Sequence, residues 1–306
     1  MELEVEIARL GAQGDGVADG PGGPIFVPFT LPGERVRIAV EPDTNRADLL
    51  DVLTPNPDRI EPVCPHFGVY GGCALQHMEA KAYLRWKRDQ VIAALRSRGL
   101  EADVEEVRPV PLGTRRRASL ALGHDKTGAA FGYHRARSHD LIDVTACPVL
   151  SPRIVGALPK LKAALASLGG RREANVSVTE TNSGLDIVVD GVRPAPAALA
   201  AFAGQAQALG VARLTVDGES LAMGGAPEVD LSGARMRLPP GAFLQASREA
   251  ESALVELVSE GVGAAKRVAD LFAGVGTFTF ALAQTAAVDA FESEEAGSCR
   301  SGGGGA

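Results

Sequence analysis

The sequence predicts a multidomain protein with three parts: a small all-β barrel, a central α+β region, and the opening unit of a nucleotide-binding α/β domain. Short runs of alternating apolar and polar residues, separated by glycine turns, fill about the first 55 residues. Helical and strand-like patterns follow through the middle, and a buried strand, a glycine turn and a helix succeed one another over 268–283. We expect these parts to span 1–57, 58–240 and 241–306.

Length and composition fit a protein with a sizeable core. The 306 residues are 45% hydrophobic and 23% charged, and the net charge of −7 argues against a chain that binds nucleic acid over its whole surface. A local basic face stays compatible with that charge. No basic-then-apolar leader opens the sequence, and no apolar run approaches membrane-spanning length. We expect a cytoplasmic monomer without a membrane segment.

The N-terminal part alternates apolar and polar positions in short runs at 3–7, 25–27 and 34–40. Glycine-containing turns are expected between these runs, for example over 14–16 and 20–23. Short strands at such spacing are typical of a closed barrel of the oligonucleotide-binding type. Another small β-domain would show the same composition.

A basic helix is expected after a proline-rich linker at 55–57. It covers 78–98, and over 81–98 it carries six basic residues against the single acid Asp89: Lys81, Arg85, Lys87, Arg88, Arg96 and Arg98. Such a run is commonly a solvated face, but in an acidic chain it favours contact with the phosphates of RNA or another polyanion. The arginine triplet at 115–117 continues this basic character on a strand-like segment.

The central region alternates strands and helices. Strands are predicted at 115–122, 129–134, 139–144, 174–180, 185–190, 211–216 and 219–223, with helices at 151–167 and 195–208. A further helix opens after 241–247, where Ser247 has the side chain of an N-cap and Glu249 and Glu251 fall in the first turn.

The stretch 268–292 is the most informative. Glycines at 274 and 276 allow a sharp turn and the close approach of a ligand, and Glu292 ends the next apolar run, where a carboxylate can accept hydrogen bonds from ribose hydroxyls. Thr279 stands where a dinucleotide fingerprint needs its third glycine, which disfavours an NAD-linked redox protein. With Asp270 before the loop, the spacing favours S-adenosylmethionine, whose cationic groups prefer carboxylates and carbonyls to a phosphate cradle. An ordinary strand–turn–helix corner is the alternative.

Taken together, the chain resembles the RNA uracil-5-methyltransferases, in particular the branch that carries an N-terminal TRAM barrel and an iron–sulfur cluster and acts on large-subunit ribosomal RNA. The matching segments keep their order over nearly the whole chain: 64–68, 71–77, the arginine triplet, 147–150, 243–245 and 270–276. The resemblance implies an enzyme that forms 5-methyluridine in rRNA from S-adenosylmethionine. It also implies cofactor contacts from Gln245 and Glu292, with Asp270, Phe272, Gly274 and Gly276 in the loop.

The resemblance further implies a 4Fe–4S cluster. The chain has four cysteines, and in a chain without a leader they favour metal ligands or catalytic groups over disulfides. Cys64, Cys73 and Cys147 match three ligands of the family's cluster, and Tyr70 stands at the position of the fourth. Because a phenolate is a harder ligand than a thiolate, three outcomes stay open: an unusual fourth ligand, a labile three-cysteine cluster, or no cluster. The three cysteines that keep their register favour a bound cluster.

In the family, a cysteine thiolate adds to carbon 6 of uracil, and a general base later removes the proton at carbon 5. Both residues lie later in the methyltransferase domain than Glu292, and Cys299, in a glycine-rich stretch, has no surroundings that would activate it. We therefore expect a C-terminally truncated and inactive form of such an enzyme. The alternative is a non-catalytic RNA-binding module.

Overall fold

The computed structural model describes residues 1–125, 128–166, 173–206, 208–221 and 224–293. The chain forms two compact units, which we describe separately: Met1–Pro109 with Arg135–Ser138, and Val110–His134 with His139–Ala306. The mixed α and β architecture with an N-terminal β region is as predicted. The finer division at 57 and 240 stays a prediction.

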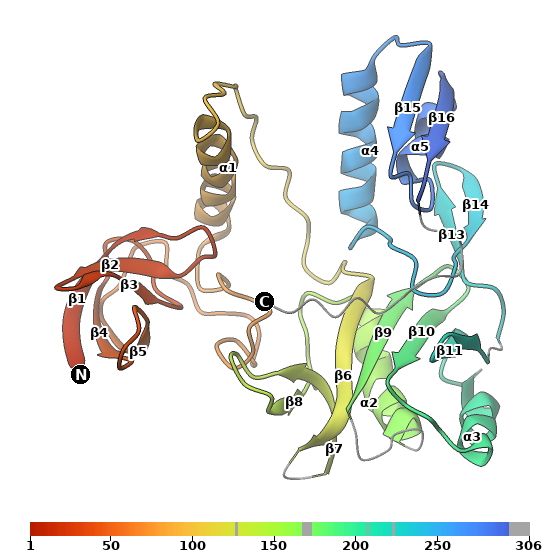
Figure 1. Ribbon diagram of the computed structural model, residues 1–306, viewed down its shortest axis with the longest axis horizontal. Helices are drawn as coiled ribbons and strands as arrows, with labels where there is room; N and C mark the ends of the chain where they lie inside the picture. Colours follow the sequence, from red (N-terminus) through yellow and green to blue (C-terminus); the bar gives the residue numbers. More distant parts are fainter. Residues whose placement is uncertain (126–127, 167–172, 207, 222–223, 294–306) are drawn as a thin grey trace. The chain divides into compact units, whose positions relative to one another are not determined.

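The first unit begins with a five-stranded antiparallel sheet in the order β3-β2-β1-β4-β5 (Figure 1). The amide of Phe26 donates to the carbonyl of Asn45 at 2.8 Å, so the two ends of this order meet and the sheet curls around its core. Ile7, Val27 and Val36 are fully buried there. The strands are β1 (Glu2–Leu10), β2 (Gly16–Gly20), β3 (Gly23–Val27), β4 (Arg35–Val40) and β5 (Ala47–Thr54).

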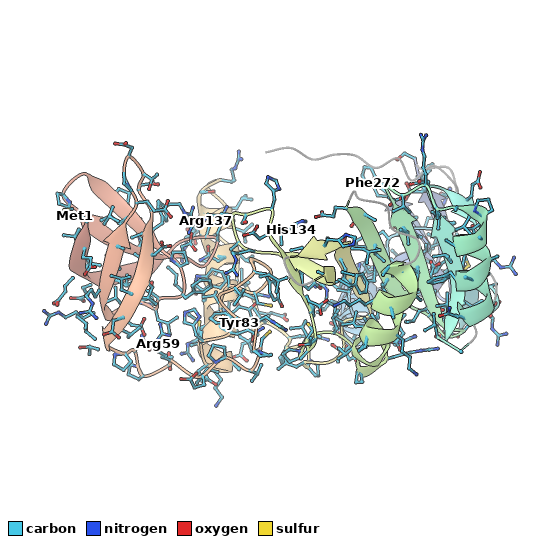
Figure 2. The ribbon with its side chains drawn as sticks, turned by 90° about the horizontal axis from the view of Figure 1, so that it is seen from below. Met1, Arg59, Tyr83, His134, Arg137 and Phe272 are labelled. Carbon is cyan, nitrogen blue, oxygen red and sulfur yellow. The ribbon has the colours of Figure 1, made fainter. Side chains whose placement is uncertain are left out.

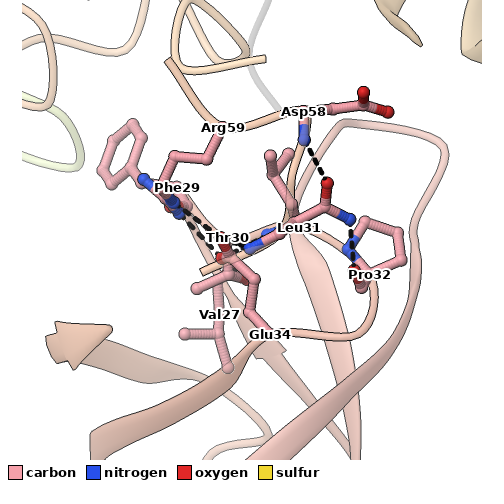
Figure 3. Close-up of polar contacts among 9 residues, drawn as sticks. Val27, Phe29, Thr30, Leu31, Pro32, Glu34, Asp58 and Arg59 are labelled. Carbon is pink, nitrogen blue, oxygen red and sulfur yellow. Dashed lines mark hydrogen bonds and ion pairs between the residues drawn. The ribbon is translucent and has the colours of Figure 1, made fainter. Parts of the chain in front are cut away.

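A buried carboxylate joins this sheet to the chain that follows it (Figure 3). Glu34 is completely buried and accepts hydrogen bonds from the amides of Leu31 at 2.8 Å and Asn56 at 3.1 Å. Arg59 adds two more, from Nε at 2.6 Å and Nη2 at 2.8 Å. Burial alone raises the pKa of Glu34, but the Arg59 and backbone hydrogen bonds outweigh it and lower the pKa below its usual value. The expected linker at 55–57 is therefore held against the sheet.

Helix α1 (Ala80–Arg96) lies within the predicted range 78–98. Glu79 caps its first turn, because its carboxylate accepts from the amides of Lys81 and Ala82. Between the sheet and this helix, a loop over 64–73 carries two of the cysteines.

The described part of the second unit contains a seven-stranded sheet in the order β12-β11-β10-β9-β6-β7-β8. Its strands are β6 (Arg117–Asp125), β7 (Gly128–His134), β8 (Leu141–Asp143), β9 (Ala174–Glu180), β10 (Leu185–Asp190), β11 (Val211–Val216) and β12 (Glu219–Ser220). Within the described strands of this sheet, β10 and β11 pair in parallel and the other neighbours pair antiparallel. Helix α2 (Pro152–Ala166) packs on β6, β7 and β9, and α3 (Pro196–Ala206) on α2. The predicted ranges of β9, β10 and β11 are confirmed.

The C-terminal part of this unit contains the predicted glycine-turn unit. Its elements are the hairpin β13 (Glu228–Leu231) and β14 (Ala234–Arg237), then α4 (Arg248–Val262), β15 (Arg267–Leu271), α5 (Thr277–Leu282) and β16 (Ala287–Phe291). Strands β15 and β16 pair in parallel, as a strand–helix–strand crossover requires. The hydroxyl of Ser247 accepts from the amide of Ala250 at 3.1 Å, which confirms the expected N-cap. Among the helices in the described ranges, none has the length and apolar composition that crossing a bilayer requires.

Candidate functional site

The loop between β15 and α5 has a strained backbone. Phe272, Gly274 and Gly276 all have positive φ, at 61°, 56° and 89°. This region is disfavoured for a bulky aromatic residue, and such strain gathers at ligand sites. The side chain of Phe272, labelled in Figure 2, is 83% exposed. At Gly276 a Cβ atom would lie 2.6 Å from the ring of Phe280, so this position requires glycine.

Thr279 has a role that its place in the sequence pattern did not reveal. Its hydroxyl donates to Oδ2 of Asp270 at 2.5 Å, and Asp270 is only 9% exposed. The residue in place of the third glycine therefore joins α5 to β15 through a charge-assisted hydrogen bond. Asp270 lies at the base of the loop, where its carboxylate adds negative charge.

Glu292 and the glycine loop lie together. Oε2 of Glu292 accepts from the amide of Gly274 at 2.7 Å, and Oε1 accepts from the amide of Ser293 at 2.7 Å. The carboxylate is exposed to solvent at the tip of β16. The glycine loop, Glu292 at the tip of β16 and Asp270 thus form one edge, which we call the acidic edge.

Gln245 lies in the segment before α4, and it is held by its backbone. Nε of Arg116 donates to the carbonyl of Gln245 at 3.0 Å, and the amide of Arg116 donates to the carbonyl of Ala246 at 2.7 Å. Within the residues that the structure describes, the Gln245 side chain makes no hydrogen bond to the glycine loop.

The arginine triplet does not form one basic surface, which corrects part of the sequence interpretation. Strand alternation turns Arg116 inward, where it is 2% exposed and pairs with Glu251. Arg115 and Arg117 face outward, and neither forms an ion pair with an acid in the described part of the chain. Burial first, and then the charges of Arg115 and Arg116, lower the pKa of Arg117.

Arg117 is held over an exposed aromatic ring. Its Nη1 donates to the carbonyl of Leu244 at 2.7 Å, and its guanidinium lies 5.1 Å from the ring centroid of Phe243. Phe243 is 66% exposed. A cation and an open ring held side by side offer charge and a stacking surface to one ligand.

Acidic side chains pair with part of the basic face of α1, which the sequence did not indicate. Arg85 lies 3.5 Å from Asp58, Arg96 lies 3.4 Å from Glu101, and Arg88 lies 4.0 Å from Asp103. Lys87 stands over the ring of Tyr83. All three ion pairs involve partly exposed side chains, so water screens them and the helix keeps a positive potential.

The cysteines lie in unlike surroundings. Cys64 is 3% exposed and its Sγ lies 3.9 Å from the hydroxyl of Tyr70. Cys147 is 8% exposed and belongs to the apolar core of the seven-stranded sheet, whereas Cys73 is half-buried. Over the described ranges, no group of three or more His, Cys, Asp or Glu residues is arranged to hold a metal ion. Cys299 lies outside the described residues.

Comparison with known proteins identifies the class first. Residues 1–47 match the TRAM domain. The chain is 43% identical to an uncharacterized RNA methyltransferase of Caulobacter vibrioides, over 94% of this chain and 72% of that relative. A similar protein of Rhizobium meliloti is 41% identical over 95% of this chain and 72% of the relative. A TRAM domain followed by a glycine-loop unit, in a chain with these relatives, defines an RNA methyltransferase.

A further relative defines the family within this class. The chain is 36% identical to the 23S rRNA (uracil(1939)-C(5))-methyltransferase RlmD of Cronobacter sakazakii, over 93% of this chain and 68% of that relative. It therefore belongs to the RNA uracil-C5-methyltransferase family. A solved structure of Pyrococcus abyssi tRNA (uracil-54, C5)-methyltransferase in complex with S-adenosyl-L-homocysteine superposes with a TM-score of 0.66 at 22% identity, over 94% of this chain and 72% of that one. At that identity the likeness shows the fold.

Proposed function

We propose that this protein binds S-adenosylmethionine and RNA as an RNA uracil-C5-methyltransferase that forms 5-methyluridine. The observation that carries the proposal is the meeting of Glu292 with Gly274 at the tip of β15 and β16. It brings a ribose-binding carboxylate to a loop that a ligand can approach closely. When bound, S-adenosylmethionine supplies an electrophilic methyl group on a cationic sulfur.

The proposed cofactor residues have separate roles. Glu292 accepts hydrogen bonds from the ribose hydroxyls, and Gly274 and Gly276 let the cofactor lie against the backbone. The exposed ring of Phe272 offers an apolar contact, and Asp270 supplies negative charge towards the cationic end of the cofactor. Gln245, held through its carbonyl by Arg116, presents its amide from the neighbouring segment. These residues are Gln245, Asp270, Phe272, Gly274, Gly276 and Glu292.

We propose large-subunit ribosomal RNA as the substrate, because RlmD of Cronobacter sakazakii is named for 23S rRNA. Arg115 and Arg117 supply charge for phosphates, and Phe243 supplies an open ring on which an unstacked base can lie. The TRAM domain at 1–47 and the basic helix α1 provide further RNA-facing surface.

For the 306-residue polypeptide by itself, we propose cofactor and RNA binding without methyl transfer. Residues 241–293, which carry the cofactor unit, contain no cysteine. Cys64 and Cys147 are buried, and Cys147 packs among apolar residues of the core on the seven-stranded sheet. The covalent step therefore has no assigned nucleophile among the described residues.

The 4Fe–4S cluster implied by the family resemblance does not fit the residues present. Such a cluster is held by thiolates, commonly four. Here Tyr70 occupies one of the ligand positions, and of the three cysteines Cys147 is packed as an apolar core residue. We therefore give Cys64, Cys73 and Cys147 no part in the proposed reaction.

Isothermal titration calorimetry of the 306-residue protein with S-adenosylhomocysteine and with NAD⁺ tests the cofactor assignment. We expect saturable binding of the first and none of the second. Filter binding of a transcribed 23S rRNA fragment over a range of salt concentrations tests the RNA assignment, and affinity should fall steeply with salt. RNA binding without S-adenosylhomocysteine binding would instead identify a non-catalytic RNA-binding module.

Transfer of tritium from methyl-labelled S-adenosylmethionine to the same RNA tests whether the 306-residue protein transfers a methyl group. We expect no labelled 5-methyluridine from the 306-residue protein. Labelled product would show that a nucleophile is present after all.

A further inference from the structure

Hydrogen bonds within the protein hold the backbone of the loop over 64–73. The amide of Phe67 donates to the carbonyl of Cys64 at 3.0 Å, and that of Val69 donates to the carbonyl of His66 at 3.1 Å. The side chain of Gln76 accepts from the amide of Cys64 at 3.1 Å. These hydrogen bonds fix the backbone on both sides of Cys64.

Tyr70 fills the interior of this loop. It is 5% exposed, and its hydroxyl lies 3.9 Å from Sγ of Cys64, which is 3% exposed. Its ring lies across Gly72, where a Cβ atom would come within 2.8 Å of a ring carbon. The aromatic ring and the thiol therefore cover each other.

The backbone of Tyr70 is also fixed. Tyr70 pairs with Arg135 in an antiparallel bridge, and the amide of Ala136 donates to the carbonyl of Val69 at 3.2 Å. Arg137, in the same segment, binds the carboxylates of Glu41 at 2.6 Å and Asp48 at 3.3 Å. Displacing the backbone at Tyr70 would disturb this arrangement.

Tyr70 and Cys64 make a packing contact between their side chains. An iron atom bound to Cys64 would need space beside the sulfur, where the phenol now lies. A hydroxyl and a thiol make a weak neutral hydrogen bond, and a phenolate is a hard ligand that matches an iron–sulfur cluster poorly. The large aromatic side chain contributes buried apolar area that a small cysteine does not.

We propose that Tyr70 closes the 64–73 loop in place of a metal centre, so that this protein folds without an iron–sulfur cluster. This proposal does not depend on the proposed methyltransferase function, because it concerns a loop outside the cofactor unit. It makes Tyr70 the residue that decides between a packed loop and a cluster site.

The test compares the wild-type protein with Tyr70→Cys and Tyr70→Phe. Each is purified anaerobically, treated with ferrous iron, sulfide and a thiol reductant, and then desalted. Iron and acid-labile sulfide per chain and the visible absorption spectrum are measured. We expect the wild type and Tyr70→Phe to be colourless and free of iron, because the ring closes the loop in both. We expect Tyr70→Cys, which brings the loop to three cysteines, to gain broad visible absorption and bound iron and sulfide.

The wild-type result decides the proposal even if a variant folds poorly. About four irons and matching sulfide in the wild type would overturn it. A folded Tyr70→Cys that stays free of iron would also overturn it, because Tyr70 would not be what excludes the cluster, and so would a Tyr70→Phe that takes up iron. Circular dichroism confirms folding of each variant. Calorimetry with S-adenosylhomocysteine on the same samples reports on the cofactor site separately.

Discussion

Nη2 of Arg116 donates to Oε2 of Glu251 at 2.5 Å, and this buried ion pair joins the residue that precedes β6 to α4. The side chains are 2% and 11% exposed. Burial lowers the pKa of Arg116, and the Glu251 carboxylate opposes that shift only in part. Because the same guanidinium also holds the carbonyl of Gln245, the central sheet and the start of the cofactor segment are fixed to each other.

Removing one partner of this pair should be strongly destabilising. Arg116→Met leaves the Glu251 carboxylate buried without a counter-charge, and we expect a loss of about 3–5 kcal/mol in the free energy of unfolding. Urea denaturation followed by circular dichroism measures it. Arg116→Met combined with Glu251→Leu should recover much of the loss. Arg248→Met, at an exposed residue of the same helix, is the control, and an equal loss there would contradict the prediction.

Stability should depend on pH through Glu34. Its pKa is lowered in the folded protein from the usual value of about 4.5, so the ionised form stabilises the fold. That contribution is fully present above about pH 4.5 and is lost as the pH falls through the folded-state pKa. We expect Glu34→Gln to cost about 1.5–3 kcal/mol at pH 7. The difference from wild type should shrink as the pH falls below about 4.5.

Urea denaturation of both proteins at several pH values between about 3 and 7 checks this. Glu4→Gln is the matched control, because Glu4 pairs with Arg35 at 2.6 Å on the exposed face of the same sheet. Its effect should stay below about 1 kcal/mol. A Glu34→Gln penalty that does not change with pH would contradict the assignment.

Glu292 should matter for the cofactor and its strand neighbour should not. Glu292→Ala removes the proposed acceptor for the ribose hydroxyls, and we expect affinity for S-adenosylhomocysteine to fall roughly 10–100-fold. Asp289→Ala removes an exposed carboxylate from the same strand, 3.1 Å from Arg267, and should leave affinity unchanged. Calorimetry measures both. Equal losses of affinity in the two variants would mean that Glu292 and Asp289 act only through their negative charge.

Thr279→Gly restores the spacing of a dinucleotide fingerprint but should not create NAD⁺ binding. The change leaves the Asp270 carboxylate, which is 9% exposed, without the hydroxyl that donates to it. We expect a loss of about 1–3 kcal/mol in stability. Urea denaturation and calorimetry with NAD⁺ measure the two effects, with Thr285→Gly as an exposed control. Micromolar NAD⁺ binding would show that glycine alone had been missing.

Arg117 should contribute to RNA binding through its charge. Arg117→Gln should weaken binding of the 23S rRNA fragment and reduce the slope of log affinity against log salt by about 1. Arg267→Gln, which removes an exposed arginine already paired with Asp289, should change the slope less. Filter binding at several salt concentrations checks this. An unchanged slope for Arg117→Gln would exclude a phosphate contact.

Local sequence patterns predicted the helices, strands and caps that depend mainly on residues close together in the sequence. The ranges of β9, β10 and β11 and the cap at Ser247 were predicted in this way. Strands β2 and β5 were missed, and so was the hairpin of β13 and β14. Strand β2 begins and ends at glycine and resembles a turn. Strand β5 has several exposed apolar residues that hide its alternation.

By itself, the sequence determined the glycine-loop unit and most of the central strands and helices, because periodicity and turn residues are read along the chain, and its motifs indicated the family. Only the tertiary structure decided that Arg116 is buried against Glu251, 135 positions away, while Arg115 is exposed and Arg117 is half-buried. It likewise decided that Tyr70 covers Cys64 and that Cys147 lies in an apolar core. The reason is physical: whether an arginine binds a phosphate or a carboxylate, and whether a thiol can reach a metal, depends on burial and on partners that packing brings together across the chain.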